Sequence, residues 1–308
     1  MTLEVRNLSV SLSGVEILHS INLCVPSGSV HGLLGQNGAG KSTLMNAIMG
    51  KLPFSPGEVV LSGQALVGDQ IRRSELIALQ PQDGQLLART TVAEITRLFS
   101  SFYSQPRDVA TVLSRVQLLD KRNDRIETLS GGQKRSLLLA LTLVANTPIL
   151  LLDEPTSGID VLTKRAIWDI IRELRAEGKA VLMSTHDMEE ANSLSDKLSI
   201  IGGGSVLAHG TPEELARRVE GRTTVEFMTA EANLQNDEVM RLFSELSSIA
   251  PPDLQVVGQS LRVRIFTGDA DHVVDRLTFN RAVKARNLRI RPPTLEDAFV
   301  FYADLKGP

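Results

Sequence analysis

The sequence has few of the residues that stabilise small secreted proteins. Only one of its 308 residues, Cys24, is a cysteine, so no disulfide can form within the chain and a reducing compartment is expected. Because Cys24 lies in an apolar stretch, we expect a buried thiol. Aromatic residues make up only 4%, and the net charge of -3 gives no excess of positive charge. This balance argues against a protein that binds nucleic acid through its charge.

Long hydrophobic runs are also absent. The longest uncharged apolar stretches, residues 136–145 and 148–152, fall short of the roughly 20 residues that a membrane-spanning helix needs. The first ten residues, MTLEVRNLSV, carry charges where a signal peptide would be apolar. We therefore expect neither a membrane span nor an export signal. The composition, 42% hydrophobic and 22% charged, is typical of a globular protein long enough for two domains.

Short aliphatic runs alternate with helical patterns, which predicts a parallel sheet covered by helices. Before them, residues 3–10 and 17–25 read as antiparallel strands, and 58–61 as part of a hairpin. Apolar spacing from 91 to 125 predicts a helical insert. The composition changes near Gly221, and residues 222–308 favour a small α+β domain, with strand patterns at 223–227 and 261–266 and helical patterns at 237–248 and 271–285. The strands expected for the parallel sheet are 30–34, 77–79, 149–152, 180–184 and 197–201.

A glycine-rich loop, GQNGAGKST at residues 35–43, lies between the run 30–34 and a helix-compatible segment. Glycine permits backbone angles that let successive N–H groups surround a phosphate at the start of a helix. Lys41 adds a positive charge and Ser42 a hydroxyl suited to Mg²⁺. The sequence therefore predicts that this loop binds a nucleoside triphosphate, through Gly35, Gln36, Asn37, Gly38, Ala39, Gly40, Lys41, Ser42 and Thr43.

Two adjacent acids, Asp153 and Glu154, follow the aliphatic run ILLL. The carboxyl ends of parallel strands are where an open sheet places its ligand. In a site that also holds a phosphate loop, we expect Asp153 to bind Mg²⁺ and Glu154 to polarise the attacking water.

With these motifs on either side of LSGGQ at residues 129–133, the chain resembles the ATP-binding cassette (ABC) ATPases. Three further motifs follow one another along the chain in the same order as in that family: Gln82, the run SGID at 157–160 and His186 in STHD. The resemblance covers about residues 3–220. It implies a P-loop NTPase fold with a parallel sheet core, an antiparallel β subdomain and a helical subdomain at about 91–135. The domains expected are an ABC ATPase domain at 1–220 and an accessory α+β domain at 221–308.

The resemblance also implies roles for individual residues. Lys41 would hold the β- and γ-phosphates of ATP, Ser42 and Asp153 the Mg²⁺, and Gln82 would sense the metal and a permease. Glu154 would be the base, and His186 would hold the γ-phosphate and the surroundings of the attacking water. Family dimers are head to tail, so each ATP also meets the second copy. The residues implied to act across that dimer are Ser130, Gly131, Gly132, Gln133 and Asp160.

Two positions depart from the family's pattern. An aromatic residue usually stacks on adenine about 23 positions before the first loop glycine, and here that position is Leu12. Stacking is worth roughly 1–3 kcal/mol per base, so weaker ATP affinity or looser base selectivity is expected. An arginine commonly follows the LSGGQ run where this chain has Ser136, and the sequence assigns no effect to that change.

Residues 222–308, which end in the run PPTLEDAF at 292–299, resemble the accessory domain of bacterial drug- and sodium-exporter ATPase subunits. We therefore expect an exporter ATPase that powers a separate membrane permease, contacts it through the helical insert and lies peripherally on the cytoplasmic face of the membrane. The alternatives are an importer subunit and a soluble, non-transport ABC ATPase. One phosphate loop and an insert of about 35 residues disfavour the last, because ribosome-acting members commonly hold two cassettes and DNA-acting members a long coiled coil.

Overall fold

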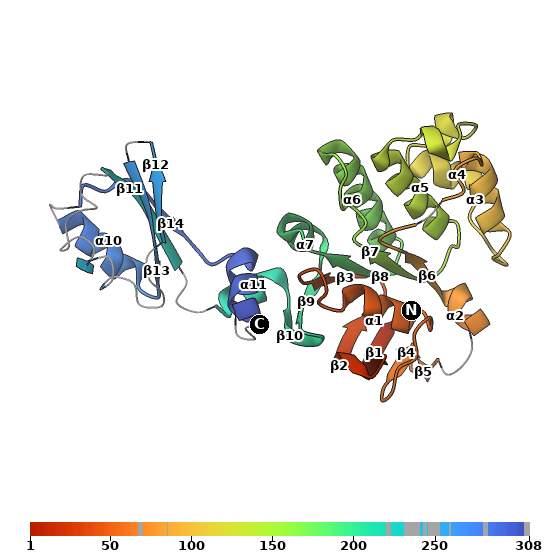
Figure 1. Ribbon diagram of the computed structural model, residues 1–308, viewed down its shortest axis with the longest axis horizontal. Helices are drawn as coiled ribbons and strands as arrows, with labels where there is room; N and C mark the ends of the chain where they lie inside the picture. Colours follow the sequence, from red (N-terminus) through yellow and green to blue (C-terminus); the bar gives the residue numbers. More distant parts are fainter. Residues whose placement is uncertain are drawn as a thin grey trace. The chain divides into compact units, whose positions relative to one another are not determined.

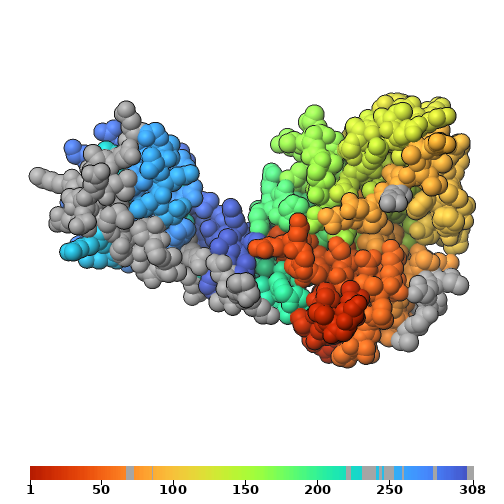
Figure 2. All heavy atoms as spheres, in the orientation of Figure 1, coloured from red at the N-terminus to blue at the C-terminus, as the bar shows by residue number. Residues whose placement is uncertain are grey.

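The computed structural model describes residues 1–66, 70–84, 86–219, 223–230, 241, 242, 245, 253–258, 260–279 and 283–304, which are coloured in Figure 2. The described chain forms two compact units, Met1–Pro212 and Glu213–Leu305. The boundary expected at residue 220 falls among residues 220–222, outside the described residues, and the compact units divide earlier in the chain. No helix among the described residues is long and apolar enough to cross a membrane.

A six-stranded sheet, in the order β10-β9-β3-β8-β7-β6, forms the centre of the first unit (Figure 1). Five of its strands are parallel neighbours, and β10 pairs antiparallel with β9 at one edge. The expected parallel sheet is therefore confirmed. Its strands are β3 Ser29–Leu34, β6 Ile77–Gln80, β7 Ile149–Asp153, β8 Ala180–Thr185, β9 Lys197–Gly202 and β10 Ser205–Gly210.

Both faces of this sheet are covered, which explains why β7 and β8 read as unbroken aliphatic runs. Leu150, Leu152 and Val181 belong to a core shared with side chains of α5 (Gly131–Leu143) and α6 (Val161–Ala176). The alternate residues of the same strands, such as Leu151 and Leu182, belong to a core shared with α1 (Lys41–Ile48) and the antiparallel sheet. The period of two along a strand therefore divides one aliphatic run between two cores.

The antiparallel sheet has the order β2-β1-β4-β5, formed by β1 Leu3–Leu12, β2 Val15–Val25, β4 Glu58–Leu61 and β5 Gln64–Ala65. Leu3 pairs with Val25 and Leu12 with Val15 across a turn at Ser13-Gly14, which confirms the expected strands and hairpin. The expectation of a buried Cys24 was wrong, because its thiol is exposed. Leu23 and Val25 face the core, so Cys24 between them must face outward.

The helical insert is confirmed as α3 (Val92–Ser100) and α4 (Val109–Arg115), followed by short 3₁₀ turns at Leu119–Lys121 and Ile126–Thr128. Thr91 begins α3 with a capping box, in which its hydroxyl accepts from the Glu94 N–H and the Glu94 carboxylate accepts from the Thr91 N–H. Apolar side chains of α3 and α4 join the core that includes α5 and α6. Arg115 of α4 pairs with Glu173 and Glu177 at the end of α6, which fixes this side of the insert.

One helix of the first unit was not expected. Helix α2 (Gln70–Leu76) carries Arg73, whose buried guanidinium donates to the carbonyl oxygens of Ile48, at 2.8 Å, and Leu66, at 2.6 Å. Arg73 thus satisfies a carbonyl at the end of α1, where the helix offers no N–H of its own. Helix α7 (Met188–Leu194) completes the unit.

The second unit contains a four-stranded antiparallel sheet in the order β12-β13-β11-β14. Its strand patterns near 223 and 261 were expected, whereas β12 and β14 were not. The helical pattern expected to reach residue 285 ends at Phe279, and most of the pattern at 237–248 lies outside the described residues. The elements are α8 Pro212–Arg217, β11 Thr223–Ala230, β12 Asp253–Val257, β13 Ser260–Thr267, α10 Ala270–Phe279, β14 Arg286–Arg291 and α11 Leu295–Asp304.

Candidate functional site

The glycine loop connects β3 to α1, as expected. Two different features of the loop favour glycine over other residues, namely the backbone angle and the close approach of neighbouring segments. Gly38 and Gly40 have φ angles of 83° and 102°, in the left-handed region that favours glycine. Gly35 does not, but a Cβ there would lie 2.6 Å from the carbonyl oxygen of Ile201. A Cβ at Gly40 would also lie 2.6 Å from Leu18 Cδ2, so β2 passes directly beside the loop. Side chains at Gly35 and Gly40 would therefore collide with neighbouring segments, whereas Gly38 has open space beside it and is favoured by its backbone angle alone.

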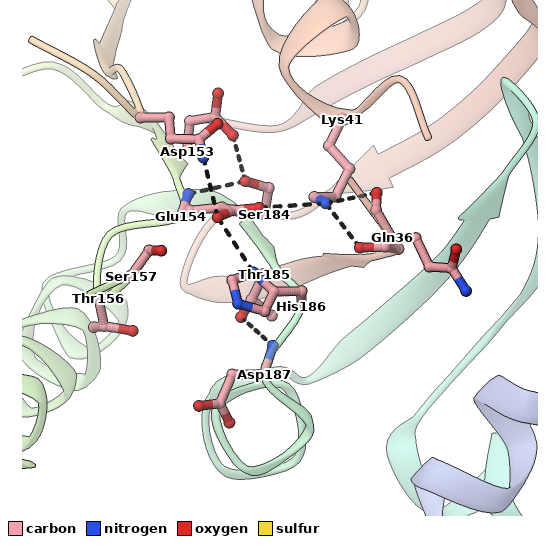
Figure 3. Close-up of polar contacts among 12 residues, drawn as sticks. Gln36, Lys41, Asp153, Glu154, Thr156, Ser157, Ser184, Thr185, His186 and Asp187 are labelled. Carbon is pink, nitrogen blue, oxygen red and sulfur yellow. Dashed lines mark hydrogen bonds and ion pairs between the residues drawn. The ribbon is translucent and has the colours of Figure 1, made fainter. Parts of the chain in front are cut away.

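Lys41, the first residue of α1, directs its ammonium group back into the loop (Figure 3). Its Nζ donates to the carbonyl oxygens of Gly35, at 2.7 Å, and Gln36, at 3.1 Å, and lies 3.4 Å from Glu154 Oε1. The Lys41 side chain is only 5% exposed. A buried ammonium surrounded by oxygen atoms fits phosphate oxygens, which would offer the same hydrogen bonds with more negative charge.

Asp153 and Glu154 lie at the carboxyl end of β7, opposite Ser184 on β8. The Ser184 hydroxyl donates to Asp153 Oδ1 at 2.5 Å and accepts from the Glu154 N–H at 2.9 Å. Glu154 has a φ of 48°, which is uncommon for a residue with a side chain. Ser184 therefore orients one acid and holds the backbone of the other in this conformation.

The Glu154 carboxylate is the point where three sequence-predicted residues meet. Besides Lys41 at Oε1, Gln82 Nε2 donates to Oε2 at 3.3 Å, and His186 Nδ1 lies 3.2 Å from the same oxygen. Glu154 is 4% exposed, whereas His186 is half exposed at 52%. Gln82 follows β6 and His186 follows β8, so the ends of neighbouring parallel strands bring these side chains together, as the sheet rule predicts.

The residues around LSGGQ form a separate cluster at the start of α5. Ser130 caps this helix: its hydroxyl accepts from the Gln133 N–H, and the Gln133 side chain accepts from the Ser130 N–H. A Cβ at Gly132 would lie 3.4 Å from Asp160 Oδ2, so the start of α5 lies beside the start of α6. Asp160 itself accepts from the N–H groups of Leu162 and Thr163. Within one chain its side chain therefore serves as a helix cap.

The sequence analysis did not identify two groups of residues that lie beside this site. Arg135 of α5 donates to the carbonyl oxygens of Gln82 and Ser157, and a basic residue so soon after LSGGQ was the available signal. Glu190 of α7 is buried and accepts from the Thr156 hydroxyl at 2.6 Å and from Trp168 Nε1 at 3.0 Å. Burial raises the pKa of Glu190, opposed by these hydrogen bonds. The STHDMEE run offered no pattern that distinguishes Glu190 from its exposed neighbour Glu189.

The donor set fits Mg²⁺ bound together with a nucleotide. The described residues contain no cluster of three or more His, Cys, Asp or Glu side chains able to hold a metal by themselves. Mg²⁺ commonly uses one or two protein ligands, with phosphates and water supplying the others. The half-buried Ser42 at the start of α1 and the buried Asp153 at the end of β7 offer ligands of that kind.

Comparison with known proteins shows what this chain is similar to. Residues 18–157 match the ABC transporter family. The Nod factor export ATP-binding protein I of Rhizobium johnstonii is 32% identical, over 97% of this chain and 94% of its own length. The linearmycin resistance ATP-binding protein LnrL of Bacillus subtilis is 28% identical, over 97% of each chain.

Solved structures agree with the sequence relatives. An ATP-binding subunit of an ABC transporter superposes with a TM-score of 0.66 at 26% identity, over 71% of this chain and 93% of its own. An ATP-binding cassette in its ADP conformation gives a TM-score of 0.62 at 25% identity, over 70% of this chain. This chain therefore belongs to the ATP-binding proteins of ABC transporters, a family that binds and hydrolyses ATP.

Proposed function

We propose that this chain is the ATPase subunit of an exporter and powers a separate membrane permease. The observation that carries the proposal is the extent of the similarity to the Nod factor export protein, which includes the second unit as well as the ATPase unit. The linearmycin resistance protein is similar over the same length. An importer subunit remains the alternative within transport, and a soluble ABC ATPase outside it.

ATP binding would begin at the glycine loop, residues 35–43. Phosphate oxygens would replace the loop carbonyls and Glu154 Oε1 as partners of Lys41 Nζ, because they offer stronger, charge-assisted hydrogen bonds. Ser42 and Asp153 would hold Mg²⁺, which neutralises charge on the phosphates when bound. Ser184 keeps one oxygen of Asp153 occupied and so orients the other.

Glu154 would act as the general base for the attacking water. Its Oε2 is held by Gln82 and lies beside His186, while its Oε1 contacts only Lys41 among the interactions described above. Transfer of Lys41 to the phosphates would leave Oε1 able to accept a proton from water. Gln82 and His186 would then orient the carboxylate, so nucleotide binding and activation of the base would be coupled.

The site would be completed by a second copy of the chain in a head-to-tail dimer. Ser130 to Gln133 begin α5 with exposed or half-buried residues, and helix N-termini favour anions such as the γ-phosphate of a partner's ATP. Asp160 would contact the second copy beside them. Each ATP would therefore be held between the loop of one copy and the LSGGQ run of the other.

The helical insert would contact a cytoplasmic helix of the permease and place the chain peripherally on the inner face of the membrane. Leu87, Leu98 and Phe102 lie on or beside this segment and are exposed, with Phe102 at 69%. These exposed apolar side chains are the candidates for that contact. Closure of the ATP dimer would then reorient the permease.

Purification of the tagged chain from membranes of its own host tests this proposal. We expect a multi-spanning membrane protein to co-purify, and a Phe102→Ser variant to recover less of it because an apolar contact is lost. Recovery of the chain with ribosomes instead, or repeatedly without any membrane protein, would contradict the exporter proposal. The transported substrate is chosen by that permease.

A further inference from the structure

Arg135 connects three segments around the proposed base. It lies in α5, the helix that Ser130 caps, and is half buried. One nitrogen of its guanidinium, Nη1, donates to the carbonyl oxygen of Gln82, and the other, Nη2, donates to that of Ser157 at 3.3 Å. Gln82 follows β6 and Ser157 follows β7, so a single side chain joins the start of α5 to the ends of two strands.

Both acceptors of Arg135 also contact Glu154. The Gln82 side chain donates to Glu154 Oε2 at 3.3 Å, and the Ser157 N–H donates to the Glu154 carbonyl oxygen at 3.2 Å. Arg135 therefore holds the backbone of two residues, Gln82 and Ser157, that each contact Glu154. None of its hydrogen bonds described above reaches the Glu154 carboxylate itself. A displacement of α5 would act on Glu154 through two independent hydrogen-bonded routes.

The geometry of these bonds favours arginine. A planar guanidinium offers several N–H donors in fixed directions and can serve two carbonyl groups at once, whereas the ammonium of a lysine is a compact charge on a flexible stem. Burial lowers the pKa of Arg135, but the nearby carboxylates of Asp83 and Glu154 oppose this effect. An arginine guanidinium is not deprotonated in proteins, so all of its N–H groups remain available for these two hydrogen bonds.

We infer that Arg135 is a positioning residue that carries the position of the LSGGQ helix to the carboxylate of Glu154. This inference rests on the proposed function, in which Ser130 to Gln133 contact the ATP held by the second copy. Engagement of that ATP by α5 would then set the geometry of Glu154, which serves the chain's own ATP. The two sites of the dimer would be coupled through Arg135.

Steady-state hydrolysis by the full chain tests this role with Arg135→Gln and Arg135→Lys. Because small displacements of a catalytic group can cost about 100-fold in rate, we expect Arg135→Gln to lower kcat about 10- to 100-fold. The affinity for ATP, measured by calorimetry, should change by less than about twofold, since the group acts on the chemical step. Lysine should restore part of the rate. Arg172→Gln, which removes an exposed arginine paired with Asp169, should retain the parent rate.

A double-mutant cycle with Gln82→Ala separates positioning from a general structural role. If Arg135 acts through Gln82, the double variant should lose less than the product of the two single losses, by at least about threefold. Additive losses, a parent rate in Arg135→Gln, or equal loss of ATP affinity in both Arg135 variants would overturn the inference. Failure of the proposed base would differ, because Glu154→Gln would then retain the parent rate.

Discussion

Replacement of Glu154 by glutamine should lower the rate of ATP hydrolysis about 10²- to 10⁴-fold, the usual contribution of a positioned general base. Glutamine has nearly the same shape, so it can keep an oxygen toward Gln82 and His186, and the backbone strain at φ 48° is unchanged. It cannot accept the proton. ATP should therefore still bind, while its hydrolysis becomes much slower.

The measurement pairs steady-state phosphate release with ATP binding by calorimetry. Glu173→Gln is the matched control, because Glu173 is 60% exposed and its pair with Arg115 is worth no more than about 1 kcal/mol at the surface. We expect the control to hydrolyse ATP at the parent rate. If Glu154→Gln also does so, another group removes the proton and the assignment of the base is wrong.

Replacement of Leu12 by tyrosine should tighten ATP binding about 5- to 150-fold, the range that corresponds to roughly 1–3 kcal/mol of base stacking. Leu12 pairs with Val15 at the end of the β1–β2 hairpin, and both side chains are exposed, at 36% and 61%. Ile17, two residues after Val15 on β2, lies beside the glycine loop: its carbonyl oxygen would be 3.7 Å from a Cβ placed on Gly40. The hairpin end thus presents aliphatic rather than aromatic surface near the glycine loop.

Calorimetry with ATP measures this effect, and the same titration with GTP reports whether base selectivity changes with it. Leu98→Tyr is the control, since Leu98 is similarly exposed, at 44%, but lies on α3 in the helical insert. Equal ATP affinity in the parent chain and Leu12→Tyr would show that the adenine does not reach this hairpin.

The location of the site followed from local sequence, whereas its contacts did not. Glycine spacing and a preceding aliphatic run place the loop between a strand and a helix without any tertiary information. The bond between Ser184 and Asp153 depends on the pairing register of β7 and β8, which neither run specifies. Arg135 donates to backbone carbonyl groups, which every residue has. The sequence therefore contained no complementary side chain that would have identified its partners.

The errors also have physical causes. Cys24 was expected to be buried because its neighbours are apolar, but alternation along a strand places neighbours on opposite faces. Strand β14, RNLRIR, is exposed along its whole length and carries three arginines, so it shows no apolar face. Its strand conformation comes from pairing with β11, and propensity within the segment gave no signal for it.

The dependence of hydrolysis on protein concentration tests the central claim, that the loop at residues 35–43 is half of a site completed by Ser130 to Gln133 of a second copy. Phosphate release is measured at saturating ATP across the range in which light scattering detects dimer formation. The account predicts that the rate per chain rises with concentration through this range and levels off when dimers predominate. A rate per chain that stays constant throughout would contradict it and indicate catalysis by a single chain.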